Sequence, residues 1–187
     1  MLNYQSFIKM NKSYSDLTIK EISPIMKLNL RGKSREFLST IGKNINMILP
    51  VEANTSSSSD KYTSMWLSPD EWMVISNTTI DKENNNYEIE ELLFNKISKN
   101  NLGAVTDVSD QFVLININGK KVFDLLSTGS PFNFNDFRTK KGAVTQTLLA
   151  QIDIIIHNKE PNNINLFVRR SFSEHLWNWI KDSASLI

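Results

Sequence analysis

Short segments in which apolar and polar residues alternate recur along the chain, and this alternation predicts half-buried β-strands. In the first half of the chain, the predicted strands cover residues 17–22, 25–30, 63–67 and 71–76. In the second half they cover residues 105–108, 112–117, 144–157 and 165–169. The segment 144–157 is long enough for a single strand or for a bent pair. The chain is therefore expected to be rich in β-structure.

Other segments carry apolar residues at spacings of three and four, which predicts amphipathic helices. One helix is expected after Gly32, one over residues 87–99, one after Gly119 and one at the end of the chain. Ser171 precedes Glu174 by three residues, which is the spacing of a capping box, so the last helix is expected to begin there.

Two polar segments separate these elements. Residues 52–61 have almost no apolar residue, which predicts a mobile surface loop. Residues 133–142 form a second polar connection, which we expect Phe134 and Phe137 to anchor.

The two halves of the chain follow a similar order of elements. Residues 25–38 align with residues 112–125, and the alignment places Gly32 opposite Gly119. Duplication and convergence on a common strand–glycine–helix junction both explain the match. Each half then follows the order β-α-β-β-α of the split β-α-β, or ferredoxin-like, pattern.

We therefore predict an α+β fold made of two ferredoxin-like halves. In this prediction residues 17–187 form a single domain of two pseudo-repeats, about 17–103 and 104–187. Residues 1–16 show little periodicity and are predicted to be a weakly ordered segment.

Composition narrows the classes of partner and chemistry. The formal net charge is only +1, so charge gives no reason to expect nucleic acid or an anionic membrane as a partner. The chain has no cysteine, which excludes disulfides, thiolate nucleophiles and Cys-ligated zinc or iron–sulfur sites. No secretory signal and no apolar run long enough to span a bilayer is visible, so a cytoplasmic location is expected.

Residue patterns typical of catalysis are scarce. His157 and His175 lack the spacing of a metal site and are expected to be ordinary packing or surface residues. The carboxylate pairs Asp70/Glu71 and Asp107/Asp110 lie at predicted turns, and among them Asp107 is the candidate for a direct chemical role. No glycine-rich phosphate loop is present. We therefore predict no catalytic, cofactor-binding or metal-binding residue.

Tryptophan and arginine are more informative, because these residue types often anchor protein interfaces. Trp177 and Trp179 stand two positions apart on the predicted last helix and cannot share one face of it. Internal packing would explain the tryptophans equally well, since tryptophan is also a large core residue. The residues predicted as a possible partner interface are Trp66, Trp72, Arg169, Arg170, Trp177 and Trp179.

The segments 65–74, 104–111, 146–150 and 167–179 resemble, in this order, the gamma subunit of heterotetrameric, tetrahydrofolate-dependent sarcosine oxidase. The most specific strings are Trp-Leu-Ser-Pro-Asp-Glu-Trp, which ends at Trp72, and Arg-Ser-Phe-Ser-Glu-His-Leu-Trp-Asn-Trp, which ends at Trp179. The similarity covers roughly residues 20–185. The Asp107-Val-Ser segment is also similar to aminomethyltransferases and folate-binding domains, which agrees with the duplicated α+β fold.

The resemblance implies a small accessory subunit that assembles with alpha, beta and delta subunits and contributes no catalytic residue. It implies that the larger subunits hold FAD, FMN, NAD and tetrahydrofolate, with no cofactor in this chain. The complex would oxidise sarcosine to glycine, pass the one-carbon unit to tetrahydrofolate and produce hydrogen peroxide. One alternative is a stand-alone folate-binding or one-carbon transfer protein related to aminomethyltransferase, and another is a scaffold for a different oxidase.

Overall fold

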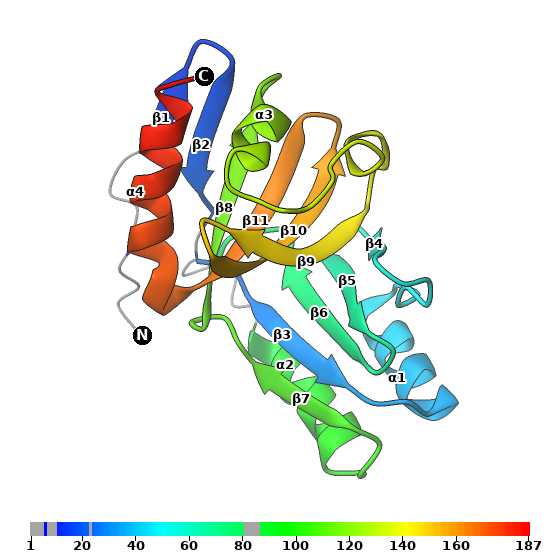
Figure 1. Cartoon of the computed structure of the whole chain (residues 1–187). Helices are drawn as coiled ribbons and strands as arrows, with labels where there is room; N and C mark the ends of the chain where they lie inside the picture. The colour runs from blue at the N-terminus through cyan, green and yellow to red at the C-terminus, as the bar shows by residue number, and fades with distance from the viewer. Residues whose placement is uncertain (1–5, 7–10, 23, 81–86) are drawn as a thin grey trace. The chain divides into compact units, whose positions relative to one another are not determined.

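The computed structural model describes residue 6 and residues 11–22, 24–80 and 87–187 (Figure 1). The chain divides into two compact units, one made of residues 24–110 and the other of residues 1–23 together with 111–187. Each unit contains one antiparallel sheet and one hydrophobic core. The predicted α+β class is therefore confirmed.

The sheet of the 24–110 unit has the strand order β4-β5-β6-β3-β7. Helix α1 follows β3, and α2 with the π-helical turn η1 precedes β7. Strands β3, β5, β6 and β7 with the two helices follow the ferredoxin-like order that the sequence predicts. The elements are β3 (Lys27–Arg31), α1 (Arg35–Ile45), β4 (Ser56–Ser58), β5 (Tyr62–Ser68), β6 (Glu71–Ser76), α2 (Tyr87–Leu93), η1 (Phe94–Ser98) and β7 (Ala104–Asp107).

Helices α1 and α2 bury their apolar residues against one face of this sheet. Phe37 from α1, Leu93 from α2 and Leu28 from β3 are completely buried in a single cluster. A side chain on Gly32 would place its Cβ 2.6 Å from the Phe37 ring, so the glycine at this strand–helix junction makes room for the ring. Ser34 caps α1, since its Oγ accepts a hydrogen bond from the Phe37 N–H at 3.0 Å.

The sheet of the other unit has the strand order β1-β2-β8-β11-β10-β9. Helices α3 and α4 cover one of its faces and contribute Phe123 and Leu176 to its core. The elements are β1 (Lys12–Tyr14), β2 (Leu17–Glu21), β8 (Phe112–Asn118), α3 (Val122–Ser127), the 3-10 turn η2 (Phe137–Thr139), β9 (Val144–Leu149), β10 (Ile152–Glu160), β11 (Asn163–Arg169), the 3-10 turn η3 (Arg170–Phe172) and α4 (Ser173–Ala184).

The two sheets repeat one arrangement of strands. The order β4-β5-β6-β3-β7 corresponds to β9-β10-β11-β8-β2, and α1 and α2 correspond to α3 and α4. The origin of the closing strand differs, because β7 follows α2 along the chain, whereas β2 precedes its neighbour β8. For this reason the boundaries of the two units, after residues 23 and 110, differ from those of the predicted pseudo-repeats 17–103 and 104–187.

Several local predictions differ from the structure. The predicted loop 52–61 contains β4, whose backbone pairs with the edge of β5 although its side chains are polar. The predicted helix 87–99 changes to a π-helical turn after Leu93. The capping-box prediction is wrong, because the 3-10 turn η3 contains Ser171 and α4 begins at Ser173 without a side-chain cap. Most of the segment 1–16 lies outside the described residues.

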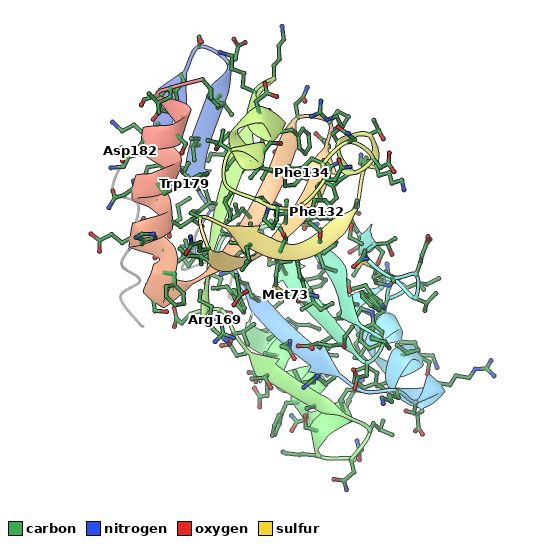
Figure 2. All side chains as sticks on the ribbon, in the orientation of Figure 1. Met73, Phe132, Phe134, Arg169, Trp179 and Asp182 are labelled. Carbon is green, nitrogen blue, oxygen red and sulfur yellow. The ribbon has the colours of Figure 1, made fainter. Side chains whose placement is uncertain are left out.

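The segment 144–157 proves to be a pair of strands, and the connection 133–142 is anchored as predicted. Ala150 and Gln151 form the β9–β10 turn with positive φ angles. Phe134, which is labelled in Figure 2, and Phe137 are 3% and 5% exposed. The two rings pack edge to face at 6.0 Å between their centroids. Apolar side chains within a polar connection can thus hold it against the core.

Gly129→Ala is expected to lower the free energy of unfolding by about 1–3 kcal/mol, as overpacking does. Gly129 lies against the indole of Trp179 on α4, and a Cβ at Gly129 would come within 2.4 Å of that ring. Trp179 is labelled in Figure 2. Chemical denaturation measures the loss, and Trp179→Phe in the same chain should recover part of it. If Gly129→Ala unfolds at the same denaturant concentration as the unchanged protein, the close packing of Trp179 on Gly129 is wrong.

Candidate functional site

Two of the carboxylates singled out in the sequence, Asp107 and Asp70, have structural roles at turns. Asp107 is exposed at the end of β7, and its Oδ1 accepts a hydrogen bond from the Ser109 N–H at 2.8 Å. The hydroxyl of Ser68 donates to Asp70 at 2.9 Å and lowers the pKa of that carboxyl. Asp70 is therefore ionised at neutral pH and lacks the raised pKa of a general base at work near neutrality.

The described part of the chain contains no group of three or more His, Cys, Asp or Glu residues that could hold a metal ion. Within the same residues, no helix is long and apolar enough to cross a membrane.

Trp72 and Trp66 belong to the 24–110 unit and lie directly opposite each other on β6 and β5. Trp72 is only 3% exposed and is a member of the core, whereas Trp66 is half-buried at the edge of that core. Trp72 therefore contacts residues of its own chain, and Trp66 retains surface that a partner can reach.

The other four residues of the predicted interface belong to the second unit. Trp177 is 8% exposed in the core, and Trp179 is half-buried beside Gly129. Arg169 is exposed at the end of β11, and Arg170 follows it in η3 (Figure 2). A contact of these residues with a partner remains a prediction, which the exposed Arg169 supports best.

A surface feature that sequence reasoning missed is an open groove of about 670 Å³ beside α1 in the 24–110 unit. One wall is the stripe of α1 that carries Arg35, Leu38 and Lys43, and the other is the segment 46–51 that follows the helix. We call this feature the α1 groove. Its most exposed apolar side chains are Ile48 and Val51, at 85% and 76% exposure.

The segment 46–51 begins with a tight reversal at the end of α1. Asn46 adopts the left-handed conformation with a φ of 51°, which is a common helix C-cap geometry. The Met47 N–H then donates to the Gly42 carbonyl at 3.0 Å. A Cβ at Gly42 would lie 3.0 Å from the Met47 carbonyl oxygen, so glycine permits the chain to fold back closely against the helix.

Three further contacts hold this segment in place. The side chain of Leu49 is 3% exposed in the core. The Nε1–H of Trp72 donates to the Pro50 carbonyl at 2.7 Å. The Ser57 hydroxyl donates to the Ile48 carbonyl at 2.6 Å. Ile48 and Val51 are thus exposed on a fixed backbone, which reduces the entropy that a binding partner must remove.

A signal for the groove was present in the sequence. The run Met47-Ile-Leu-Pro-Val51 contains only apolar residues and precedes the polar residues 52–61. Five consecutive apolar residues outside a regular element cannot all point into one core, so some must be exposed.

The comparison with known proteins gives the family. The sarcosine oxidase gamma subunit family model matches residues 32–186. The chain belongs to the sarcosine oxidase gamma subunit family. The resemblance found in the sequence is thereby confirmed. As a member of a gamma subunit family, the chain is a small subunit of a larger enzyme and has partner subunits.

Solved structures agree with this family in fold. A chain of the heterotetrameric sarcosine oxidase from Corynebacterium sp. U-96 in complex with pyrrole 2-carboxylate matches with a TM-score of 0.80 and 19% identity, over 90% of this chain and 84% of that chain. The glycine cleavage system aminomethyltransferase T from Bartonella henselae matches with a TM-score of 0.64 and 14% identity, over 88% of this chain and 45% of that one. No curated protein sequence matches the chain.

Proposed function

We propose that this gamma-family chain is the accessory subunit of a heterotetrameric sarcosine oxidase and supports assembly of that complex. The observation that carries the proposal is the family match, which covers residues 32–186 and therefore includes most of each unit. The α1 groove adds a fixed, exposed apolar surface of the kind that subunits bury on association.

In this proposal the partners are alpha, beta and delta subunits, and the larger ones hold FAD, FMN, NAD and tetrahydrofolate. The complex would demethylate sarcosine to glycine in the cytoplasm, pass the one-carbon unit to tetrahydrofolate and release hydrogen peroxide. The turn-closing role of Asp107 and the core position of Trp72 support an accessory role, because both side chains are engaged within the chain.

Co-purification of the tagged chain from its own cells tests the proposal. We expect large flavoprotein subunits in amounts equal to the tagged chain when the eluate is quantified by mass spectrometry. The large subunits purified without this chain should assemble poorly and regain oxidase activity when it is added. Recovery of the tagged chain alone, together with large subunits that are fully active without it, would contradict the proposal.

The alternative, a stand-alone folate-binding or one-carbon transfer protein, rests on the fold shared with aminomethyltransferase T. It predicts that the isolated chain binds tetrahydrofolate and that Asp107→Asn weakens this binding. Isothermal titration at millimolar folate distinguishes the alternatives, since the accessory-subunit proposal requires no heat of binding by this chain.

A further inference from the structure

We propose that the α1 groove binds an apolar segment of a partner subunit that carries two carboxylate side chains, one toward Arg35 and one toward Lys43. This inference rests on the proposed accessory function and adds the chemistry of the contact. In this inference the apolar part of the partner segment contacts Ile48 and Val51, and its carboxylates pair with Arg35 and Lys43.

The apolar part of the proposal follows from the arrangement of the groove. Ile48 and Val51 are exposed on the segment 46–51, and two half-buried apolar side chains, Leu38 of α1 and Met47, line the same groove. Because the hydrogen bonds of the segment 46–51 fix its backbone, a partner gains apolar contact here without first ordering a loop. An apolar partner segment therefore fits this surface better than a polar one.

The charged part follows from the two cations on the rim. Arg35 and Lys43 are both exposed, and they stand eight residues apart on the stripe of α1 that lines the groove. At about 1.5 Å of rise per residue, this spacing separates the Cα atoms of Arg35 and Lys43 by about 12 Å along the helix axis. Cations beside an apolar surface favour a partner of opposite charge, because complementary potentials set the register of an interface.

The acidic side chains nearby leave these two cations available. No Asp or Glu lines the groove, and neither Arg35 nor Lys43 forms a salt bridge with any residue of the described chain. Glu36 follows Arg35 in the sequence and Glu52 follows Val51. Both glutamates are exposed, but neither lines the groove. The lining is therefore positive and apolar, and the matching partner surface is negative and apolar.

Two pairs of substitutions in the tagged full-length chain test the proposal by co-purification. Ile48→Ser with Val51→Ser removes the exposed apolar side chains, and Arg35→Glu with Lys43→Glu reverses the charges. Each pair is expected to reduce the recovery of large subunits at least tenfold, and added salt should weaken recovery by the unchanged chain. All four side chains are solvent-exposed, so the thermal unfolding temperature should remain within a few degrees.

Matched controls separate the groove from general surface effects. Lys61→Glu with Lys99→Glu reverses two exposed charges of the same unit away from the groove. Leu186→Ser removes an apolar side chain that is 86% exposed in the other unit. Both controls should recover large subunits as the unchanged chain does.

Each result decides the proposal. Full recovery by both groove variants would overturn it and leave the accessory function intact, whereas failure of the unchanged chain to recover any large subunit would overturn both. Loss with the serine pair alone would overturn the acidic part of the partner segment. If a second copy of this chain is recovered through the groove in place of large subunits, self-association replaces the proposal.

Discussion

Trp72→Ala is expected to lower the free energy of unfolding by about 3–5 kcal/mol, the usual range for emptying a buried aromatic site. The Trp72 side chain is 3% exposed and packs against Phe37 at 6.0 Å between ring centroids. Its Nε1–H also donates to the Pro50 carbonyl at 2.7 Å. The substitution therefore creates a cavity in the core and removes the hydrogen bond that holds the wall of the α1 groove.

A conservative variant and a matched control divide this effect into its parts. Trp72→Phe keeps most of the ring but removes the donor to Pro50, which should cost about 1–3 kcal/mol. Trp66→Ala changes the residue opposite Trp72 on β5. Because Trp66 is only half-buried, this substitution should lower the free energy of unfolding less than Trp72→Ala does. Urea denaturation of the three variants measures these differences. Equal losses at the two tryptophans would contradict the core position of Trp72.

Lowering the pH from 6.5 to about 4 is expected to destabilise the fold through His157 by up to about 3 kcal/mol, at about 1.4 kcal/mol per pKa unit. His157 is 4% exposed on β10, where it lies opposite Asn165 of β11 and Val144 of β9. Burial, and secondarily the charge of Lys159, lowers the pKa of His157 from 6.5 to about 4.

The direction of the pH effect follows from the proton balance. Well above pH 6.5 the imidazole is neutral in both the folded and the unfolded chain and makes no difference to stability. Below pH 6.5 the unfolded chain binds a proton that the folded chain does not, so the free energy of unfolding falls until the pH reaches about 4. Below that pH both states are protonated and the loss from this residue is complete.

Denaturation curves at several pH values between 7.5 and 4.5 measure this effect. His157→Gln should reduce the slope of stability against pH in this window, whatever it does to stability at pH 7.5. His175→Gln, at a histidine exposed on α4, is the matched control for the substitution itself. A slope that is the same in all three proteins would contradict the role assigned to His157.

The sequence predicted the positions of individual strands more reliably than it predicted which strands pair in the sheets. Alternation identified β2 because Leu17 and Ile19 are buried on one side while Thr18 and Lys20 are exposed on the other. The pairing of β2 with β8 depends on residues far apart in the chain, which local periodicity does not report. Strand β4 was missed because its serines give no apolar signal, although its backbone pairs with β5.

The candidate site was less accessible to sequence reasoning for a similar reason. Residue type identified Trp72 and Trp177 as large anchors, but it could not say whether each anchors its own core or a partner. Conversely, Ile48 and Val51 resemble core residues and prove to be exposed, because Leu49 and Pro50 between them take the inward positions. The direction of a side chain in an irregular segment follows from tertiary hydrogen bonds that no local pattern contains.

The position of β2 also affects how the chain matures on the ribosome. β2 is synthesised before residues 24–110, yet its neighbour β8 is not made until the whole of that segment has been produced. Those intervening residues hold a complete sheet and core, so they can fold while β2, paired on one side with β1, still lacks β8 on the other. The nascent chain therefore carries an open edge of β2 throughout this interval, which makes this the stage of biogenesis where a chaperone has the most to protect.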